Sequence, residues 1–353
     1  MLHTFRQDRH FQARIQSELL TLKEQLDPGH LATVEVKVPD LGERDFVRGG
    51  SKPLLKVRDG EGRVYLFKQC DPALAAAEEA AYELRRLGGR PSVPARRASM
   101  CIDGLEAHGL LKPYAEFDNE RQLEPDTTQW SEEQRAVMLL EHAWEWFLDN
   151  LDTNTSQYGL MGPLELPVNV DWDRSFFSAA QSELSRFAKY RATLPNARTF
   201  LYADYVAGKT KLPLWLLSQE ARRIRRLPKA RVRAILERYA AVCFDDPAQR
   251  EHFVTRVLRR RHGIEREVAT FMRELWAERR SLETPPDGLR ELVNRQLLLR
   301  WADWQLVLNS AMRGPVGSLA RRVLSFTRGL RAPVTPVTPA PDAVDEDRAR
   351  PAA

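Results

Sequence analysis

Acidic and basic side chains along the first half of the chain form a pattern with chemical meaning. Lys68 lies in the apolar run Val-Tyr-Leu-Phe-Lys, and two glutamates follow in an alanine-rich segment. Asp152 comes after a long apolar stretch, and Asp171 comes after the run Pro-Val-Asn-Val. Phosphoryl transfer from a nucleotide requires a cation on the phosphates, a carboxylate that holds this cation, and carboxylates for a metal and an acceptor hydroxyl. This order of residue types predicts a phosphotransferase.

A glycine-containing segment precedes the strand that leads to this lysine. Gly49 and Gly50 leave backbone N–H groups able to approach phosphate oxygens, and Ser51 and Lys52 could add donors. The same residues also suit an ordinary turn. Both interpretations stay open from the sequence.

The lysine strand and the next helix provide a possible ion pair. Period-two alternation places Leu66 and Lys68 on one face of the strand, away from the neighbouring aromatic residues. An ammonium group in so apolar a strand requires an anion unless it reaches water at the strand end. Glu78 or Glu79 can supply that anion, although a pair of helix glutamates also suits a solvated face.

The acidic stretch after the long helix offers several candidates. Asp149, Asn150 and Asn154 are also common turn residues. We assign Asp152 to activation of the acceptor hydroxyl and Asp171 to metal binding, because an apolar strand directly before Asp171 implies burial.

The elements that must position these residues indicate an α+β fold with a small antiparallel-sheet lobe and a larger helical lobe. Apolar spacing predicts a helix over residues 5–26. Strand patterns occupy 33–38, 53–57, 63–69, 94–100 and 109–114, with one helix, 72–87, between them. Ser131 with Gln134 is typical of a capping box. Beyond 116 only 167–172 suits a strand, and helices are expected at 178–192, 214–226, 229–243, 247–259, 264–281 and 287–311.

Composition limits the class of protein. The chain has 353 residues, a net charge of +5 and 43% hydrophobic residues, which is ordinary for a globular protein. No apolar run approaches the roughly 20 residues that a bilayer crossing needs, and the N-terminus lacks the apolar segment of a secretory signal. We therefore expect a cytoplasmic protein without a membrane partner. Three widely separated cysteines argue against a disulfide framework or a cysteine-based zinc site.

Assembled, these motifs resemble the atypical protein-kinase-like fold shared by HipA-type kinases, phosphatidylinositol 3- and 4-kinases and secretory kinases of the Golgi casein kinase type. The resemblance runs from about residue 34 to about residue 280. It implies that Lys68 contacts the nucleotide phosphates and that Glu78, four residues before Tyr82, is its partner. It also implies that Gly-Leu-Leu-Lys-Pro-Tyr is the hinge, so that ATP would place its adenine near the backbone of Lys112, Pro113 and Tyr114.

The resemblance also assigns the catalytic loop. Asn150-Leu151-Asp152 matches the family's Asn-x-Asp, which implies that Asp152 is catalytic. Thr153 and Asn154 replace the family's Arg-His, and Gln157 stands where a metal-binding Asn is expected. A second register pairs Asp149 with Asn154.

The motif Val-Asp-Trp-Asp-Arg-Ser-Phe resembles the metal-binding Asp with a Phe five residues later, which selects Asp171 over Asp173. Asp171 and Gln157 would then bind Mg²⁺ or Mn²⁺.

The sequence thus predicts residues 1–30 as an N-terminal helix, 31–116 as the sheet lobe, 117–284 as the helical lobe, 285–330 as a helical extension and 331–353 as a disordered proline-rich tail. The leading hypothesis is an ATP- and Mg²⁺-dependent kinase acting on a protein serine or threonine. A nucleotide-binding pseudokinase or scaffold is the first alternative, because of Gln157 and the missing Arg-His.

A nucleic-acid surface is the second alternative. It is based on arginines and a lysine that cluster in two stretches: Arg222, Arg223, Arg225, Arg226, Lys229, Arg231, Arg233 and Arg259–Arg261. Glutamates interrupt these stretches, and no aromatic stacking pattern accompanies them. The sequence therefore favours a solvated face over a nucleic-acid partner.

Overall fold

A computed structural model gives the fold, and it describes residues 2–26, 54–58, 62–102, 105–113, 123–124, 126–150, 155–176 and 197–283. All of them lie in the first of the two units into which the chain divides, Met1–Leu292. The predicted strand at 33–38, the helices at 178–192 and 287–311 and the proline-rich tail lie outside the described residues.

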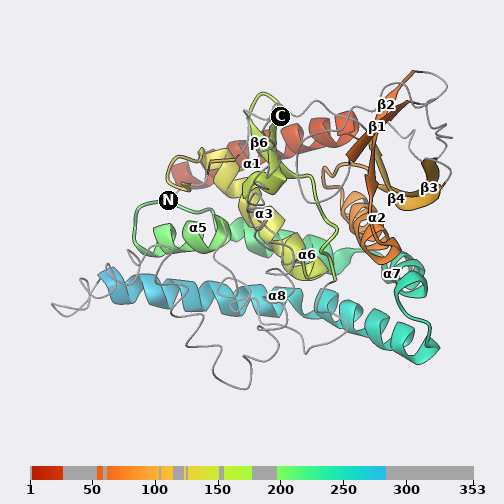
Figure 1. Cartoon of the computed structure of the whole chain (residues 1–353). Helices are drawn as coiled ribbons and strands as arrows, with labels where there is room; N and C mark the ends of the chain where they lie inside the picture. Colours follow the sequence, from red (N-terminus) through yellow and green to blue (C-terminus); the bar gives the residue numbers. More distant parts are fainter. Residues whose placement is uncertain are drawn as a thin grey trace, which may run out of the picture. The chain divides into compact units, whose positions relative to one another are not determined.

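The first part of the fold is a four-stranded antiparallel sheet (Figure 1). Its strands are β1 (Leu54–Arg58), β2 (Val64–Gln69), β3 (Arg96–Ile102) and β4 (Leu105–Pro113), in the order β1-β2-β4-β3. One face buries an apolar cluster that includes Tyr65, Phe67 and Leu111. Leu110 points to the other face and packs with Ala75 and Tyr82 of the adjoining helix. The alternation predicted for β2 is therefore confirmed.

That helix is α2 (Pro72–Leu87), which packs on β3, β4 and α7. The side chain of Asp71 accepts a hydrogen bond from the backbone N–H of Ala73, and Pro72 opens the first turn. Gly88 ends the helix, and a Cβ atom there would lie 2.4 Å from the Trp144 ring. The glycine thus lets α2 approach α3 closely.

Helix α3 (Glu132–Leu148) is buried along almost its whole length. Ser131 and Gln134 form the predicted capping box at its start. A 3₁₀ turn, Thr155–Gln157, and the hairpin of β5 (Tyr158–Met161) and β6 (Leu166–Asn169) follow. The sequence predicted a strand at the β6 position and missed β5, because Tyr-Gly-Leu-Met is too short for a clear alternation.

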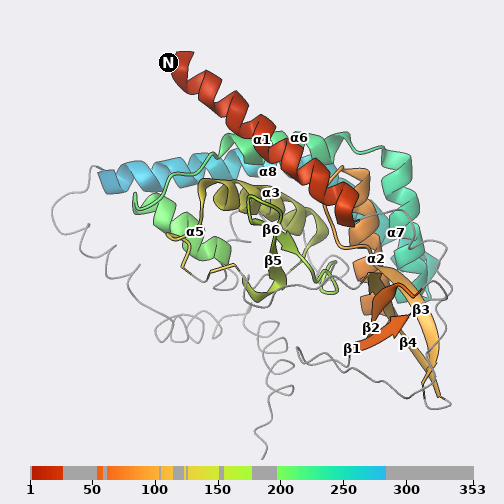
Figure 2. The ribbon, with the colours of Figure 1, turned by 90° about the horizontal axis from the view of Figure 1, so that it is seen from above.

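The remaining helices form the larger apolar core with α3. They are α5 (Ala197–Val206), α6 (Trp215–Arg226), α7 (Lys229–Cys243) and α8 (Pro247–Glu283). Helices α6 and α7 both pack on α8. Helix α1 (Leu2–Leu26) buries Ile15, Leu19 and Leu22 against residues of α3, β6 and α6. Figure 2 shows α1 crossing α6.

One prediction about these helices was wrong, and one helix was missed. The expected helices at 247–259 and 264–281 are one continuous helix, α8. A Cβ atom at Gly263 would meet only Arg266, at 3.8 Å, so this glycine has room within a regular helix and does not break it. Helix α5 was not anticipated. The fold class is confirmed: α+β, with a small antiparallel sheet and one helix followed by a mainly helical region.

Candidate active site

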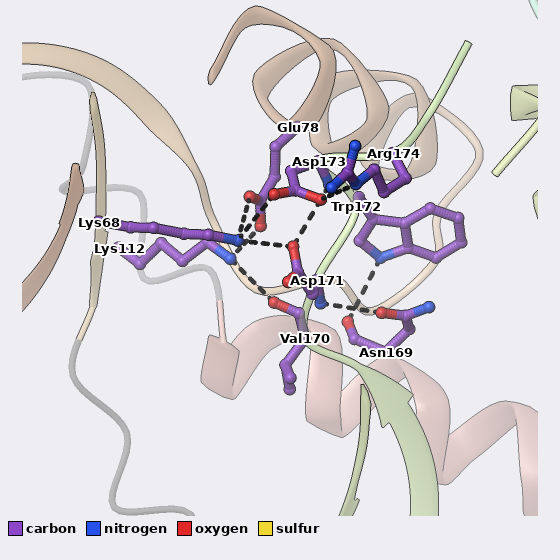
Figure 3. A network of polar contacts seen from close by, with 9 residues as sticks. All are labelled: Lys68, Glu78, Lys112, Asn169, Val170, Asp171, Trp172, Asp173 and Arg174. Atoms are coloured by element: carbon purple, nitrogen blue, oxygen red, sulfur yellow. Dashed lines mark hydrogen bonds and ion pairs between the residues drawn. The ribbon is translucent and has the colours of Figure 1, made fainter. Parts of the chain in front are cut away.

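Five charged side chains from β2, α2, β4 and the segment after β6 meet in one cluster (Figure 3). We call it the site cluster: Lys68, Glu78, Lys112, Asp171 and Asp173. The Lys68 Nζ atom lies 2.8 Å from Asp171 Oδ1, 3.3 Å from Asp173 Oδ2 and 3.6 Å from Glu78 Oε2. The structure therefore brings together the lysine, the glutamate and the aspartate that the sequence singled out.

Sheet register explains why two lysines point into the cluster. In the pairing of β2 with β4, Leu66 lies opposite Lys112 and Lys68 lies opposite Leu110. Lys68 and Lys112 are thus diagonal neighbours on one face. Because Leu110 packs against α2, this face is the one that α2 covers. Both lysine side chains extend from it toward Glu78 (Figure 3).

Glu78 is buried in α2 and serves both lysines. Its Oε1 atom forms an ion pair with Lys112, and its Oε2 atom faces Lys68. Glu79, one position on, turns to the other side and accepts from the Nε atom of Arg97 at 2.5 Å. The 100° step of the helix places Glu78 toward the lysines and Glu79 away from them, and Glu78 is the glutamate that the resemblance implied.

Electrostatics keep the lysine charged. Burial by itself lowers the pKa of Lys68, but the carboxylates of Glu78, Asp171 and Asp173 together raise it above its usual value. Burial raises the pKa of Glu78, and the two lysines oppose that rise without cancelling it. Lys68 is therefore a fixed cation at every physiological pH.

The aspartates are held by a short, well-bonded segment after β6. The backbone N–H of Asp171 donates to Asn169 Oδ1 at 2.8 Å, and the Lys112 ammonium donates to the Val170 carbonyl at 2.8 Å. Trp172 is buried between the two aspartates, and the Arg85 guanidinium stacks over its ring at 4.4 Å. Helix α2 thus contacts this segment directly through Arg85, and Glu78 is linked to it through Lys68 and Lys112.

Gln157 lies beside the same segment. Its backbone carbonyl accepts a hydrogen bond from the Val170 N–H at 2.8 Å, one position past the β5–β6 pairing. Its side-chain Oε1 atom is buried and has no hydrogen-bond partner among the described residues. An unpartnered amide oxygen suits a hard cation such as Mg²⁺.

Asp149 has a different environment. It ends α3 in the left-handed region, with φ 54°, and is 1% exposed. Its Oδ1 atom lies 3.3 Å from Nη2 of the buried Arg260. This ion pair between α3 and α8 gives Asp149 a role in the core and favours the register that begins at Asp152.

Several predicted site residues lie outside the described residues: Gly49, Gly50, Ser51, Tyr114, Asp152 and Asn154. Their roles stay predictions. Leu66 is partly buried in β2, and Pro113 ends β4 opposite Tyr65. Sequence reasoning used only the backbone of Lys112 and rejected Asp173, whereas both side chains belong to the site cluster. Lys112 and Leu110 are two residues apart in β4 and so lie on the same face of the strand, which could have indicated that the Lys112 side chain belongs to the site.

The clustered arginines do not form one surface. Arg233 pairs with Glu237 at 2.7 Å and also with Glu251. Arg260 is buried and donates to the Trp146 carbonyl, and Arg261 donates to the Leu227 carbonyl at 2.6 Å. These three arginines serve the helices themselves. Others on α6 line a pocket, described below.

Over the described ranges, no group of three or more His, Cys, Asp or Glu side chains is placed to hold a metal. A Mg²⁺ ion that also uses substrate phosphates as ligands needs only one or two protein carboxylates. No helix in the described part of the chain is long and apolar enough to cross a membrane.

Comparisons with known proteins give structural similarities. No protein-family model matches the chain, and no curated protein matches it. The Helicobacter pylori proinflammatory kinase CtkA is similar with a TM-score of 0.44 and 11% identity, over 69% of this chain and 97% of that one. HipA in its complex with HipB and operator DNA from Shewanella oneidensis has a TM-score of 0.39 and 12% identity, over 70% and 72%.

A MAP kinase of Leishmania major is similar with a TM-score of 0.29 and 12% identity, over 71% of this chain and 87% of that one. HipA-type kinases are also among the proteins that the sequence motifs resemble. With TM-scores below 0.5, these similarities do not by themselves assign an activity. The assignment depends on the side chains of this chain.

Proposed function

We propose that the protein is an ATP- and Mg²⁺-dependent phosphotransferase of the HipA-like kind, with a protein serine or threonine as its acceptor. One observation carries the proposal: a lysine of the sheet, a glutamate of the following helix and an aspartate after a hairpin converge on one another, with Lys68 Nζ 2.8 Å from Asp171 and 3.6 Å from Glu78. A phosphoryl-transfer site requires these three groups together.

The residues present have separate tasks in this proposal. Lys68 binds the nucleotide phosphates, and Glu78 holds its ammonium in position. Lys112 anchors Glu78 from the other side and bonds the Val170 carbonyl, so it joins the sheet to the segment that carries Asp171. Asp171 and the unpartnered oxygen of Gln157 would hold Mg²⁺, which supplies charge neutralisation on the phosphates.

Asp152 would act on the acceptor hydroxyl. The hydroxyl oxygen forms a bond to the γ-phosphorus, the bond from that phosphorus to the β–γ bridging oxygen breaks, and the hydroxyl proton passes to the Asp152 carboxylate. This carboxylate contributes to the transition state far more than to nucleotide binding. Binding and transfer should therefore respond differently to its removal.

The test combines nucleotide binding with transfer of labelled phosphate. The wild-type protein is incubated with labelled ATP, Mg²⁺ or Mn²⁺ and candidate proteins, itself included, and thermal unfolding is measured with and without ATP and Mg²⁺. Asp152→Ala should keep the ATP-induced stabilisation and lose transfer. Glu78→Gln should weaken both, whereas Glu79→Gln, which changes the neighbouring glutamate bound to Arg97, should weaken neither. Equal effects of the two glutamate variants would contradict the proposal.

A pseudokinase is the second candidate, and Gln157 is the observation that favours it. A glutamine places its amide oxygen one methylene farther from the backbone than an asparagine does, which alters the distance to a metal held with Asp171. If wild-type protein binds ATP and transfers no phosphate, and Gln157→Asn restores transfer, the chain is a nucleotide-binding pseudokinase or scaffold. Loss of transfer in Asp149→Ala with retention in Asp152→Ala would instead select the other register.

A further inference from the structure

A second site lies away from the site cluster, between α1, the end of α2 and α6. It is an open pocket of about 510 Å³, a size in the range of small-molecule sites. Its charged and polar lining consists of arginines and glutamines: Gln12, Gln16, Gln219, Arg222, Arg223 and Arg226. Leu87 of α2 also lines it, nine residues along the helix from Glu78. At 1.5 Å per residue, that separates the two sites by about 13 Å along the helix.

The pocket has an excess of positive charge. Arg222 and Arg226 are exposed, and neither has a carboxylate within ion-pair distance in the part of the chain that the structure describes. Arg223 lies 3.4 Å from Glu220, but that carboxylate already pairs with the buried Arg90. Two guanidinium groups thus share the Glu220 carboxylate, and Arg222 and Arg226 add two further positive charges.

Crowding among these cations is visible at Arg223. Burial lowers its pKa, and the nearby Arg90 guanidinium lowers it further, against the opposite effect of Glu220. Arg223 also donates to the Gly88 carbonyl at 3.3 Å, which fixes its position at the end of α2. An anion bound in the pocket would relieve this repulsion.

The spacing of the arginines suits one compact anion. Arg222 and Arg226 are four residues apart in α6, so their side chains leave the same face of the helix. Guanidinium groups bind phosphate through two parallel hydrogen bonds each. The glutamines opposite can donate to and accept from uncharged polar groups, and Gln12 Nε2 already donates to Gln219 Oε1 at 2.8 Å across the pocket.

We propose that this pocket binds a small phosphorylated molecule, with its phosphate on Arg222, Arg223 and Arg226 and its uncharged polar part against the glutamines of α1 and α6. The site is independent of the proposed kinase activity. A bound ligand would contact α1, α6 and the end of the helix that carries Glu78.

Binding is measured by isothermal titration calorimetry at low ionic strength with inorganic phosphate, glycerol 3-phosphate and glucose 6-phosphate, and with glucose as the uncharged comparison. We expect saturable binding of one sugar or glycerol phosphate per chain, tighter than that of inorganic phosphate, and none of glucose. Arg222→Gln combined with Arg226→Gln should weaken it at least about tenfold, and Arg226→Lys should weaken it less, because the charge remains and the paired hydrogen bonds are lost.

Two controls separate this site from others. Arg231→Gln with Arg259→Gln removes the same charge from exposed positions outside the pocket and should leave binding unchanged. Lys68→Met should also leave phosphate binding unchanged if the phosphate lies in the arginine pocket. Binding would be lost in this variant only if the phosphate lay in the site cluster.

Four results would overturn the proposal: no binding of any phosphate, unchanged binding in the Arg222 and Arg226 double variant, equal loss in both double variants, or loss in Lys68→Met. Tighter binding of a phosphoserine peptide or an oligonucleotide than of the small phosphates would overturn the ligand class, because the partner would then be a macromolecule. Both double variants change exposed side chains, so retained thermal unfolding checks that the fold is intact.

Discussion

Two clusters of buried charged side chains in this molecule differ in how their members are paired with one another. In the site cluster, Glu78 is shared by two lysines and Lys68 faces three carboxylates. The other group, which we call the clamp cluster, consists of Arg90, Trp144 and Glu220. There Arg90 donates two hydrogen bonds to Glu220, and the Trp144 Nε1–H donates a third at 2.5 Å.

Exposure separates the two clusters further. The Asp171 side chain is 31% exposed, whereas the Glu220 side chain is 1% exposed and the Arg90 side chain is 5% exposed. Burial alone raises the pKa of Glu220, but Arg90, Arg223 and Trp144 reverse this and lower it. In the site cluster the pKa of Glu78 stays raised. The clamp cluster is closed to solvent, and its hydrogen bonds stabilise the fold. The site cluster shares its partners and reaches solvent, so its charged groups can exchange a protein partner for a ligand.

The largest effect should come from breaking the clamp cluster. Arg90→Met leaves the Glu220 carboxylate buried with the more exposed Arg223 as its only described guanidinium partner. We expect the free energy of unfolding to fall by about 3–5 kcal/mol, as when one partner of a buried ion pair is removed. Denaturant unfolding measures this. Arg233→Met, at an exposed pair, should change the same quantity little, and a comparable loss there would mean that burial is not what distinguishes the clamp cluster.

Breaking the site cluster should act on function. Lys68→Met should reduce phosphate transfer about 10²–10³-fold, the usual effect of losing one electrostatic donor on the transition state. Its free energy of unfolding should change less than that of Arg90→Met, because Asp171 reaches solvent. Transfer of labelled phosphate and denaturant unfolding of both variants give the comparison. A variant that unfolds while retaining activity per folded molecule would reverse the roles of the two clusters.

A pH series sharpens the comparison with a third buried carboxyl, Glu145. Burial and the nearby Glu141 raise the pKa of Glu145 well above its usual value, despite Arg85. The folded state therefore holds a proton that the unfolded chain releases near its ordinary pKa of about 4.3, and stability falls as the pH rises from there to the folded pKa. Glu145→Gln should remove this loss, worth about 1.4 kcal/mol for each unit of pKa shift, while the amide oxygen still accepts from the Tyr158 hydroxyl.

Glu220→Gln is the matched variant with the opposite sign. The folded pKa of Glu220 is lowered, so its contribution is present above the unfolded pKa and lost as the pH falls through the folded one. The variant should be less stable than wild type at neutral pH, and the difference should shrink in acid. The free energy of unfolding, measured at several pH values, tests both the Glu145→Gln and the Glu220→Gln variant. Parallel pH curves for the two variants would refute the distinction.

The smallest effect concerns how closely the clamp cluster is packed. A Cβ atom at Gly88 would overlap the Trp144 ring, so Gly88→Ala should cost about 1–3 kcal/mol through overpacking. Gly208→Ala meets open space and strains only a backbone with φ 75°, at about 1 kcal/mol. Thermal unfolding should rank them in that order. The reverse order would mean that Trp144 moves aside at little cost.

Local features were readable from the sequence alone. The Asp71-Pro72 start of α2, the capping box of Ser131 and Gln134 and the bounds of α7 depend on hydrogen bonds and dihedral angles within a few residues. The alternation in β2 placed Lys68 opposite the aromatic face for the same reason. The residue types near each other in the chain were therefore sufficient to predict the α+β class, and they singled out Lys68, Glu78 and Asp171, which the structure brings together.

Tertiary structure decided what depends on residues far apart in the chain. The choice of Glu78 over Glu79, the inward direction of Lys112 and the pairing of Asp149 with Arg260 follow from how α2, the sheet and α8 pack. The ion pair of Arg90 with Glu220 joins segments 130 residues apart, and no local pattern marks it. The sequence determined which side chains could carry charge into the interior. Packing determined which partner each one received, because a buried charge is tolerated only where another element supplies its counter-charge.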